Sequence, residues 1–278
     1  MSVQHNASPI DTTKIVAFIG GGNMAQALIG GLLAEGLAAT MIRVAEPVAE
    51  LRELLGLRGV GVYATAAEAI LGADVVVLAV KPQIIQTVLA EIAPQVGGKL
   101  VISIAAGVSV ATLTQGLAGH GRIVRAMPNT PALVQSGATG LYAPASLSQA
   151  DRVLAGTILA AAGLVLWVED EALMHAVTAV SGSGPAYFFY LMESMIAAGV
   201  AQGLDERTAR ALTLQTALGA AQMAIISEES PARLRQNVTS PNGTTAAAID
   251  HLDQHAVREH IVGALQAAGQ RSMALSAS

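Results

Sequence analysis

Hydrophobic residues in the first part of the chain form short aliphatic runs that alternate with helix-like stretches. The runs predict strands at 14–20, 41–46, 60–63, 74–80, 100–105, 122–127, 139–142 and 164–168. The stretches between them predict helices that include 24–35, 47–55, 82–92, 110–117 and 147–162. Strands that alternate with helices pair in parallel through right-handed crossovers. We therefore expect an α/β fold with a doubly wound, mostly parallel sheet.

The strand pattern stops near residue 170, and only helical patterns follow. These helices are predicted at 171–180, 185–202, 206–227, 231–237, 244–252 and 256–276. The chain is thus expected to contain an α/β domain over 14–169 and an all-helical domain over 170–278. Residues 1–13 are polar and lack the apolar core of a signal peptide, so they are interpreted as a flexible extension.

Composition narrows the possible functions. Hydrophobic residues make up 53% of the chain and charged residues only 13%, which predicts more apolar surface than a monomer can bury and hence a homo-oligomer. The net charge of −5 and the lack of basic runs argue against nucleic acid as a partner. The most apolar stretch, within 74–81, is a strand rather than a membrane span. The absence of cysteine excludes disulfides and iron–sulfur clusters and fits a cytoplasmic protein.

A glycine turn follows the first predicted strand and opens a helix. Gly20 permits the tight turn, Gly22 lets the backbone approach a diphosphate, and Ala25 allows close helix packing. The amides of 21–24 are expected to point at the phosphates, helped by the helix dipole. A plain strand–helix turn is the alternative, but the flanking strand, helix and second strand favour a Rossmann-type dinucleotide site.

Glu46 ends the second predicted strand, where a carboxylate binds the ribose 2′-hydroxyl and favours NAD over NADP. Arg43 and Arg52 lie nearby in sequence and would oppose that preference, and a solvated turn acid is the alternative interpretation. The choice between NADPH and NADH therefore stays open at this point.

Two further strand ends are expected to line the path of the cofactor. Residues 79–82 read Ala-Val-Lys-Pro, and 105–107 read Ala-Ala-Gly, small residues that leave room for the nicotinamide ribose. For Lys81, an equally weighted alternative is that it is only a solvated charge at the end of the strand. The residues expected to bind the cofactor are Ile19, Gly20, Gly21, Gly22, Asn23, Met24, Glu46, Ala79, Val80, Lys81, Pro82, Ala105, Ala106, Gly107 and Asn129.

Three loops carry polar residues that aliphatic packing does not explain. In 127–131, two prolines brace a loop whose Asn129 and Thr130 can face the crevice, with a structural turn as the alternative. The segment 181–185 is expected to join two helices, with Ser183 as a possible helix cap. The uncharged loop 237–245 starts a helix, where free amides suit a small carboxylate.

Five motifs, taken in order along the chain, resemble those of the pyrroline-5-carboxylate reductase family. They are Phe-Ile-Gly-Gly-Gly-Asn-Met-Ala (18–25), Ala-Val-Lys-Pro (79–82), Met-Pro-Asn-Thr-Pro (127–131), Ala-Val-Ser-Gly-Ser-Gly-Pro-Ala-Tyr (179–187) and Val-Thr-Ser-Pro-Asn-Gly-Thr-Thr (238–245). The resemblance covers about 14–275, and its last two motifs are specific. It implies reduction of 1-pyrroline-5-carboxylate to proline with NADPH or NADH. It also implies an N-terminal dinucleotide domain and a helical domain that forms a homodimer, which often builds larger rings such as a decamer.

The resemblance also implies roles for individual residues. The Ser240 hydroxyl and the amides of Gly243, Thr244 and Thr245 would hold the substrate carboxylate, and the Thr245 hydroxyl would bond the ring nitrogen. Thr245 and Ser240 are thus the predicted catalytic residues. The predicted substrate-binding residues are Asn237, Ser240, Gly243, Thr244, Thr245 and Glu228. At two places, Ala66 and the 45–46 pair, the chain departs from the family pattern, which leaves the choice of cofactor in doubt.

Two rival functions are weaker. A β-hydroxyacid dehydrogenase needs a lysine base near the glycine-rich helix start, and 186–192 contains none. A catalytically silent nucleotide sensor would be expected to have a damaged 239–245 loop, which is intact here. No metal is expected, because His251 and His255 share a helical face without a third ligand.

Overall fold

The computed structural model describes Asp11 and residues 13–276, so the predicted flexible extension 1–13 lies almost wholly outside the described residues. The described chain divides into two compact units. The helical unit contains residues 184–267, and the sheet unit contains the residues before 184 together with 268–276. Helix α7 and the last residues of α12 therefore group with the sheet rather than with the other late helices.

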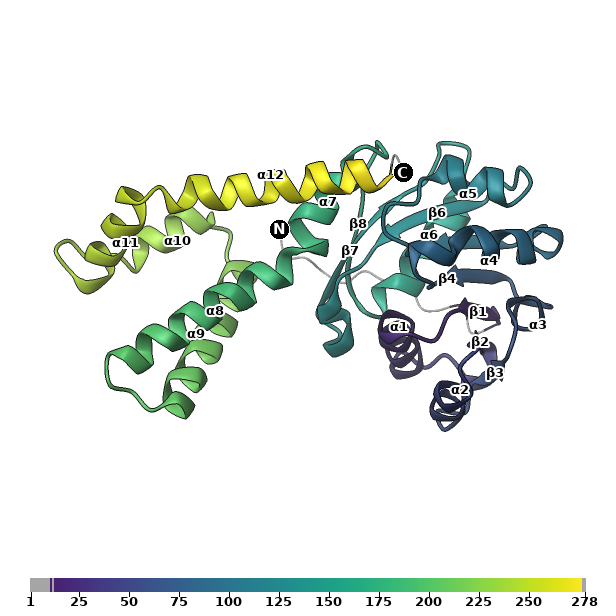
Figure 1. Cartoon of the computed structure of the whole chain (residues 1–278), viewed down its shortest axis with the longest axis horizontal. Coiled ribbons are helices and arrows are strands. Elements are labelled where there is room, and N and C mark those ends of the chain that lie inside the picture. Colours follow the sequence, from purple (N-terminus) through teal and green to yellow (C-terminus); the bar gives the residue numbers. More distant parts are fainter. Residues whose placement is uncertain (1–10, 12, 277–278) are drawn as a thin grey trace. The chain divides into compact units, whose positions relative to one another are not determined.

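The sheet contains the eight predicted strands, in the order β3-β2-β1-β4-β5-β6-β7-β8 (Figure 1). They are β1 (Val16–Ile19), β2 (Ile42–Ala45), β3 (Gly61–Tyr63), β4 (Val75–Leu78), β5 (Leu100–Ser103), β6 (Ile123–Met127), β7 (Gly137–Tyr142) and β8 (Gly163–Trp167). All neighbours pair in parallel except β6 and β7, which are antiparallel. The predicted mostly parallel sheet is confirmed.

Helices pack on both faces of this sheet. They are α1 (Asn23–Ala34), α2 (Ala49–Gly56), α3 (Ala66–Ile70), α4 (Ile85–Ile92), α5 (Val110–Gly116), α6 (Gln149–Ala160) and α7 (Leu173–Val177), with short helices η1 (Ala39–Met41), η2 (Pro82–Ile84), η3 (Ala93–Gln95) and η4 (Thr130–Val134). Successive side chains of a strand face opposite sides. Val16 and Phe18 therefore pack against α1, α2 and α6, whereas Ala17 and Ile19 pack against α3, α4 and α5.

The strand order reverses between β1 and β4, which are neighbours although two strands separate them in sequence. In register, Ile19 pairs with Leu78, so Gly20 and Ala79 stand side by side where the two strands end. In open α/β sheets this reversal point opens a crevice at the carboxyl ends of the strands, where ligands bind. The fold thus brings the two motifs that contain Gly20 and Ala79 to one place.

The segment 181–185 joins α7 to the next helix, as predicted, but through a π-helical turn rather than a loop. A π-helical turn, η5 (Thr178–Gly182), follows α7, and α8 (Gly184–Ala201) begins almost at once. The Ser183 amide donates to the Thr178 carbonyl, five residues back, at 2.8 Å. Pro185 has no N–H to give to the Ser181 carbonyl, which breaks the regular ladder at this point.

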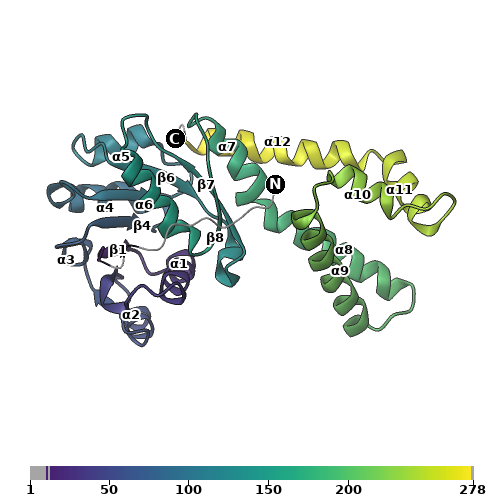
Figure 2. The ribbon, with the colours of Figure 1, turned by 180° about the vertical axis from the view of Figure 1, so that it is seen from behind.

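The helical unit contains α8, α9 (Glu206–Ile226), α10 (Pro231–Asn237), α11 (Thr244–Gln254) and the first part of α12 (Val257–Ser276). Helices α8 and α9 lie side by side as a hairpin (Figures 1 and 2). Phe188, Phe189, Tyr190 and Leu191 on α8 are all more than half exposed. Four adjacent large side chains in water favour coverage by another protein surface.

No helix in the described residues is both long and apolar enough to span a bilayer.

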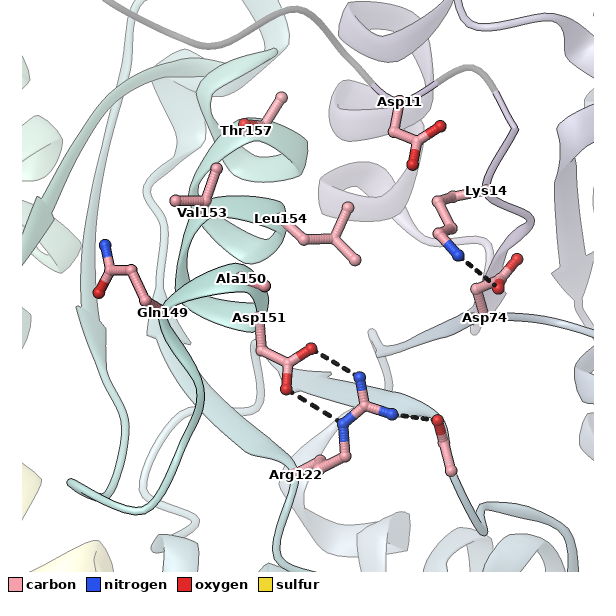
Figure 3. A pocket seen from close by; sticks show the side chains of 11 residues that line it. Asp11, Lys14, Asp74, Arg122, Gln149, Ala150, Asp151, Val153, Leu154 and Thr157 are labelled. Carbon is pink, nitrogen blue, oxygen red and sulfur yellow. Dashed lines mark hydrogen bonds and ion pairs between the residues drawn. The ribbon is translucent and has the colours of Figure 1, made fainter.

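A pocket of about 580 Å³ opens at the opposite end of the sheet from the crevice (Figure 3). Lys14, Asp74 and Arg122 line it, and each lies just before or at the start of a strand. Lys14 pairs with Asp74 at 3.1 Å, and Arg122 binds Asp151 at 2.6 Å. Four of the pocket's charges are therefore paired, whereas Asp11, which also lines it, accepts hydrogen bonds from Thr13. None of the predicted site residues lines this pocket.

Asp151 should contribute to stability in a pH-dependent way. The hydrogen bond from Arg122 holds the pKa of Asp151 below its ordinary value. A lowered carboxyl pKa stabilises the fold at neutral pH, and this contribution is lost as the pH falls below about 4 and Asp151 becomes protonated. Because Arg122 is 44% exposed, we expect Asp151→Asn to lower the free energy of unfolding at pH 7 by only about 1–2 kcal/mol.

Urea unfolding of both proteins between pH 7 and pH 3 measures this difference. The gap between wild type and Asp151→Asn should shrink as the pH falls. Glu53→Gln, which changes an exposed acid on α2, is the control and should leave stability unchanged. A gap that is constant over the whole pH range would show that the ion pair is not its source.

Candidate functional site

The glycine turn after β1 is fixed by contact with β4. Gly20 has φ +101°, and a Cβ added there would lie 2.7 Å from the Ala79 carbonyl oxygen. The Gly20 amide donates to the Ala45 carbonyl at 2.9 Å, and the Ala79 amide donates to the Ile19 carbonyl at 2.8 Å. Only glycine fits this conformation and this spacing. The turn therefore holds the ends of β1, β2 and β4 together.

The start of α1 offers hydrogen-bond donors to an anion. Gly22 is the N-cap, no side chain of the described residues caps it, and a Cβ added there would meet no atom within 4 Å. The first amides of the helix, at Asn23 and Met24, thus keep free N–H groups beside open space. The Gly21 amide, which we expected to join them, instead donates to Glu46 Oε2 at 2.9 Å. The remaining donors and the space suit the diphosphate of a dinucleotide.

Glu46 is buried, with only 7% of its surface exposed, so the alternative of a solvated turn acid is wrong. Its Oε1 accepts a hydrogen bond from the Val48 amide at 3.0 Å, in addition to the Gly21 bond on Oε2. Arg52 Nη1 donates to the Glu46 and Pro47 carbonyl oxygens at 2.7 and 2.8 Å. The carboxylate is therefore fixed at the end of β2, beside the glycine turn.

Ala66, the position where the chain departs from the family pattern, is buried as the first residue of α3. Thr65 caps this helix in a reciprocal capping box with Glu68, a start signal that our strand and helix assignment missed because α3 is only five residues long. An alanine side chain carries no hydrogen-bonding group, so it gives no polar contact to a cofactor at this point.

The other two strand ends differ in exposure. After β4, Pro82 starts η2, as expected for a residue without an N–H, and Lys81 is exposed. After β5, Ala105 is buried, its amide lies 3.4 Å from Ser103 Oγ, and Gly107 turns the chain with φ +77°. Both segments lie at the carboxyl edge of the sheet, where a dinucleotide extends from the glycine turn.

Two long-range contacts hold this edge in place. Glu171 Oε1 accepts from the Val110 amide, at the start of α5, and from Arg125 Nη1, each at 2.8 Å. Arg125 is almost completely buried. The pair therefore links β6, α5 and the segment before α7, and Arg125 lies in register with Ser103 at the end of β5.

Both polar atoms of the Asn129 side chain form hydrogen bonds within the protein. Its Nδ2 donates to the Ser181 carbonyl at 3.0 Å, and its Oδ1 accepts from the Ala138 amide at 2.8 Å. The Ser181 carbonyl is the one that Pro185 cannot satisfy, so Asn129 compensates for the break at the π-helical turn. This agrees with the structural alternative for the 127–131 loop, and its cofactor contact remains a prediction.

In the helical unit, α11 begins much as α1 does. Gly243 is the N-cap without a side-chain hydrogen bond, so the amides of Thr244 and Thr245 remain free. The Gly243 amide, also predicted to hold the substrate, donates to the Ser240 carbonyl at 3.0 Å. Neither the Ser240 hydroxyl nor the Thr245 hydroxyl has a hydrogen-bond partner among the described residues.

The two remaining predicted substrate residues lie near this loop in sequence. Asn237 Nδ2 donates to Glu229 Oε2 at 2.7 Å, so the side-chain amide of Asn237 already has a partner within the protein. Glu228 is exposed. The described residues contain no cluster of three or more His, Cys, Asp or Glu side chains that could hold an ion. His255 Nδ1 instead lies 2.7 Å from the His251 carbonyl.

Comparison with known proteins covers both units. The family model for pyrroline-5-carboxylate reductase dimerisation matches 171–275, and the model for NADP oxidoreductase, coenzyme F420-dependent, matches 15–107. The pyrroline-5-carboxylate reductase of Pseudomonas aeruginosa is 52% identical over 95% of this chain and 98% of its own. That of Pasteurella multocida is 47% identical over 93% and 96%.

Solved structures agree. The pyrroline-5-carboxylate reductase of Coxiella burnetii superimposes with a TM-score of 0.91 at 43% identity, covering 95% of this chain and 99% of that one. The Plasmodium falciparum enzyme, solved with NADP bound, gives 0.86 at 29% identity with the same coverage. Taken with the two free helix starts, these similarities show that the chain belongs to the pyrroline-5-carboxylate reductase family.

Proposed function

We propose that this chain reduces the ring C=N bond of 1-pyrroline-5-carboxylate to give proline, the last step of proline biosynthesis, with NADPH or NADH as the hydride donor. The observation that carries the substrate assignment is the start of α11, where free amides and two unpartnered hydroxyls stand in a loop without charged residues. These donors suit a small carboxylate, which a helix N-terminus stabilises. Residues 14–169 would bind the dinucleotide and 170–278 the substrate.

The reaction adds a hydride to the imine carbon and a proton to the ring nitrogen. When bound, the reduced nicotinamide supplies the hydride. The chain contributes alignment: the amides of Thr244 and Thr245 and the Ser240 hydroxyl would fix the carboxylate, and the Thr245 hydroxyl would face the nitrogen. A threonine hydroxyl is too weak an acid to protonate the imine at cellular pH, so Thr245 orients the nitrogen while the proton comes from the iminium form or from water.

Self-association follows from the dimerisation family match over 171–275. We propose a homodimer in which the exposed α8 side chains are covered by the second copy, and a decamer as a larger assembly. A cytoplasmic location is proposed with it.

Substrate assays test the reaction. Purified protein should oxidise NADH or NADPH only after pyrroline-5-carboxylate is added, and chromatography should identify proline as the product. 1-Pyrroline, which lacks the carboxylate, is the matched control substrate. We expect its kcat/KM to be at least about 100-fold lower, because the α11 donors have nothing to bind. Equal kcat/KM values for the two imines would contradict carboxylate recognition.

The role of Thr245 can be tested separately. We expect Thr245→Ala to lower kcat about 10–100-fold, because one hydrogen bond to the nitrogen is lost in the transition state. The Kd for the dinucleotide should not change, and Thr245→Ser should recover much of the rate. Thr40→Ala, at an exposed threonine of η1, is the control. Full turnover by Thr245→Ala would rule out this role.

A further inference from the structure

The Glu46 carboxylate lies between the starts of two helices. Its Oε2 accepts from Gly21, just before α1, and its Oε1 accepts from Val48, the N-cap of α2. Backbone N–H groups at helix starts are the donors that bind phosphate in nucleotide sites. In this chain, an internal carboxylate already uses two of these donors next to the glycine turn.

This arrangement distinguishes a ribose hydroxyl from a ribose phosphate. Each Glu46 oxygen accepts one backbone hydrogen bond and has a second acceptor site left. A 2′-hydroxyl can donate to it. A 2′-phosphate carries negative charge and is mostly without protons at neutral pH, so it meets a buried like charge instead.

The nearby arginines offset this charge only partly. Arg43 donates to the Leu71 carbonyl, and Leu71 precedes β4, so the guanidinium lies toward the amino end of the sheet, away from Glu46. Arg52 directs Nη1 at two backbone carbonyls, those of Glu46 and Pro47. Arg52 thus stabilises the turn after β2, and of these two arginines it is the one that could contact a ribose 2′-phosphate.

We infer that Glu46 makes this chain selective for NADH over NADPH, because its carboxylate takes the place and the donors that a 2′-phosphate would need. The selectivity depends on this chain's own residues and rests on the proposed function only in that pyrroline-5-carboxylate is taken as the molecule that accepts the hydride. The Plasmodium falciparum relative was solved with NADP bound.

Binding of two cofactor fragments tests the inference without turnover. ADP-ribose and 2′-phospho-ADP-ribose differ only by the 2′-phosphate, and calorimetry gives a Kd for each. Wild type should bind ADP-ribose at least about tenfold more tightly. Glu46→Gln, which keeps the length of the side chain but removes its charge, and Glu46→Ser should shift the ratio of the two Kd values about 10–100-fold toward the phosphorylated fragment.

Glu50→Gln is the matched control, because it removes one negative charge from an exposed position four residues away and should leave the ratio unchanged. The ratio of kcat/KM for NADH and NADPH should follow the binding ratio in every variant. Tighter binding of 2′-phospho-ADP-ribose by wild type, or an unchanged ratio in both Glu46 variants, would overturn the inference. Fragment discrimination without any turnover of pyrroline-5-carboxylate would instead disprove the proposed function and leave the inference standing.

Discussion

The free N–H groups at two helix starts, one in each compact unit, are the constraint on which both candidate anion sites depend. Helices α3, α5, α6, α9 and α10 begin at a Thr, Ser or Asp whose side chain accepts a bond from the first turn. Helices α2, α4 and α7 lack such a bond and begin at residues other than glycine. Helices α1 and α11 also lack it and begin at Gly22 and Gly243. A glycine N-cap leaves the donors open to an external anion, at some cost to the stability of the helix. The two predicted anion sites are these two starts.

The hydrophobic pattern was sufficient to predict the eight strands and their mostly parallel pairing, because most of them are buried aliphatic runs that alternate with helices. It did not give their order, and β3 and β8 are only partly buried. It did not reveal the antiparallel β6–β7 pair, whose direction depends on the turn through η4. It also missed the π-helical turn at 178–182. Pro185 marks where the regular ladder breaks, but the hydrogen bond that satisfies the Ser181 carbonyl comes from Asn129, 52 residues away, and no local pattern encodes it.

The site residues show a similar limit. Residue type and position at a strand end or helix start were enough to place Gly20, Glu46 and Thr245 in the right local structures. They could not tell which polar atoms are already used inside the protein. The amides of Gly21 and Gly243 and the side chain of Asn129 each have an internal partner, and the partner of Gly21 lies 25 residues away. Such pairing is a property of the packed chain rather than of the motif.

Both proposed ligands are anions, yet the protein has a net charge of −5 and the 237–247 segment contains no charged residue. Recognition would therefore rest on oriented amides and hydroxyls instead of on cations. Fixed dipoles act over a short range, so they discriminate between ligands by geometry more than they attract them from a distance. Glu46 adds the opposite element, a buried negative charge that would repel one extra phosphate. Selectivity at these two helix starts would thus come from the geometry of neutral donors and, at Glu46, from repulsion of a second negative charge. The number of basic residues in the sequence therefore does not predict it.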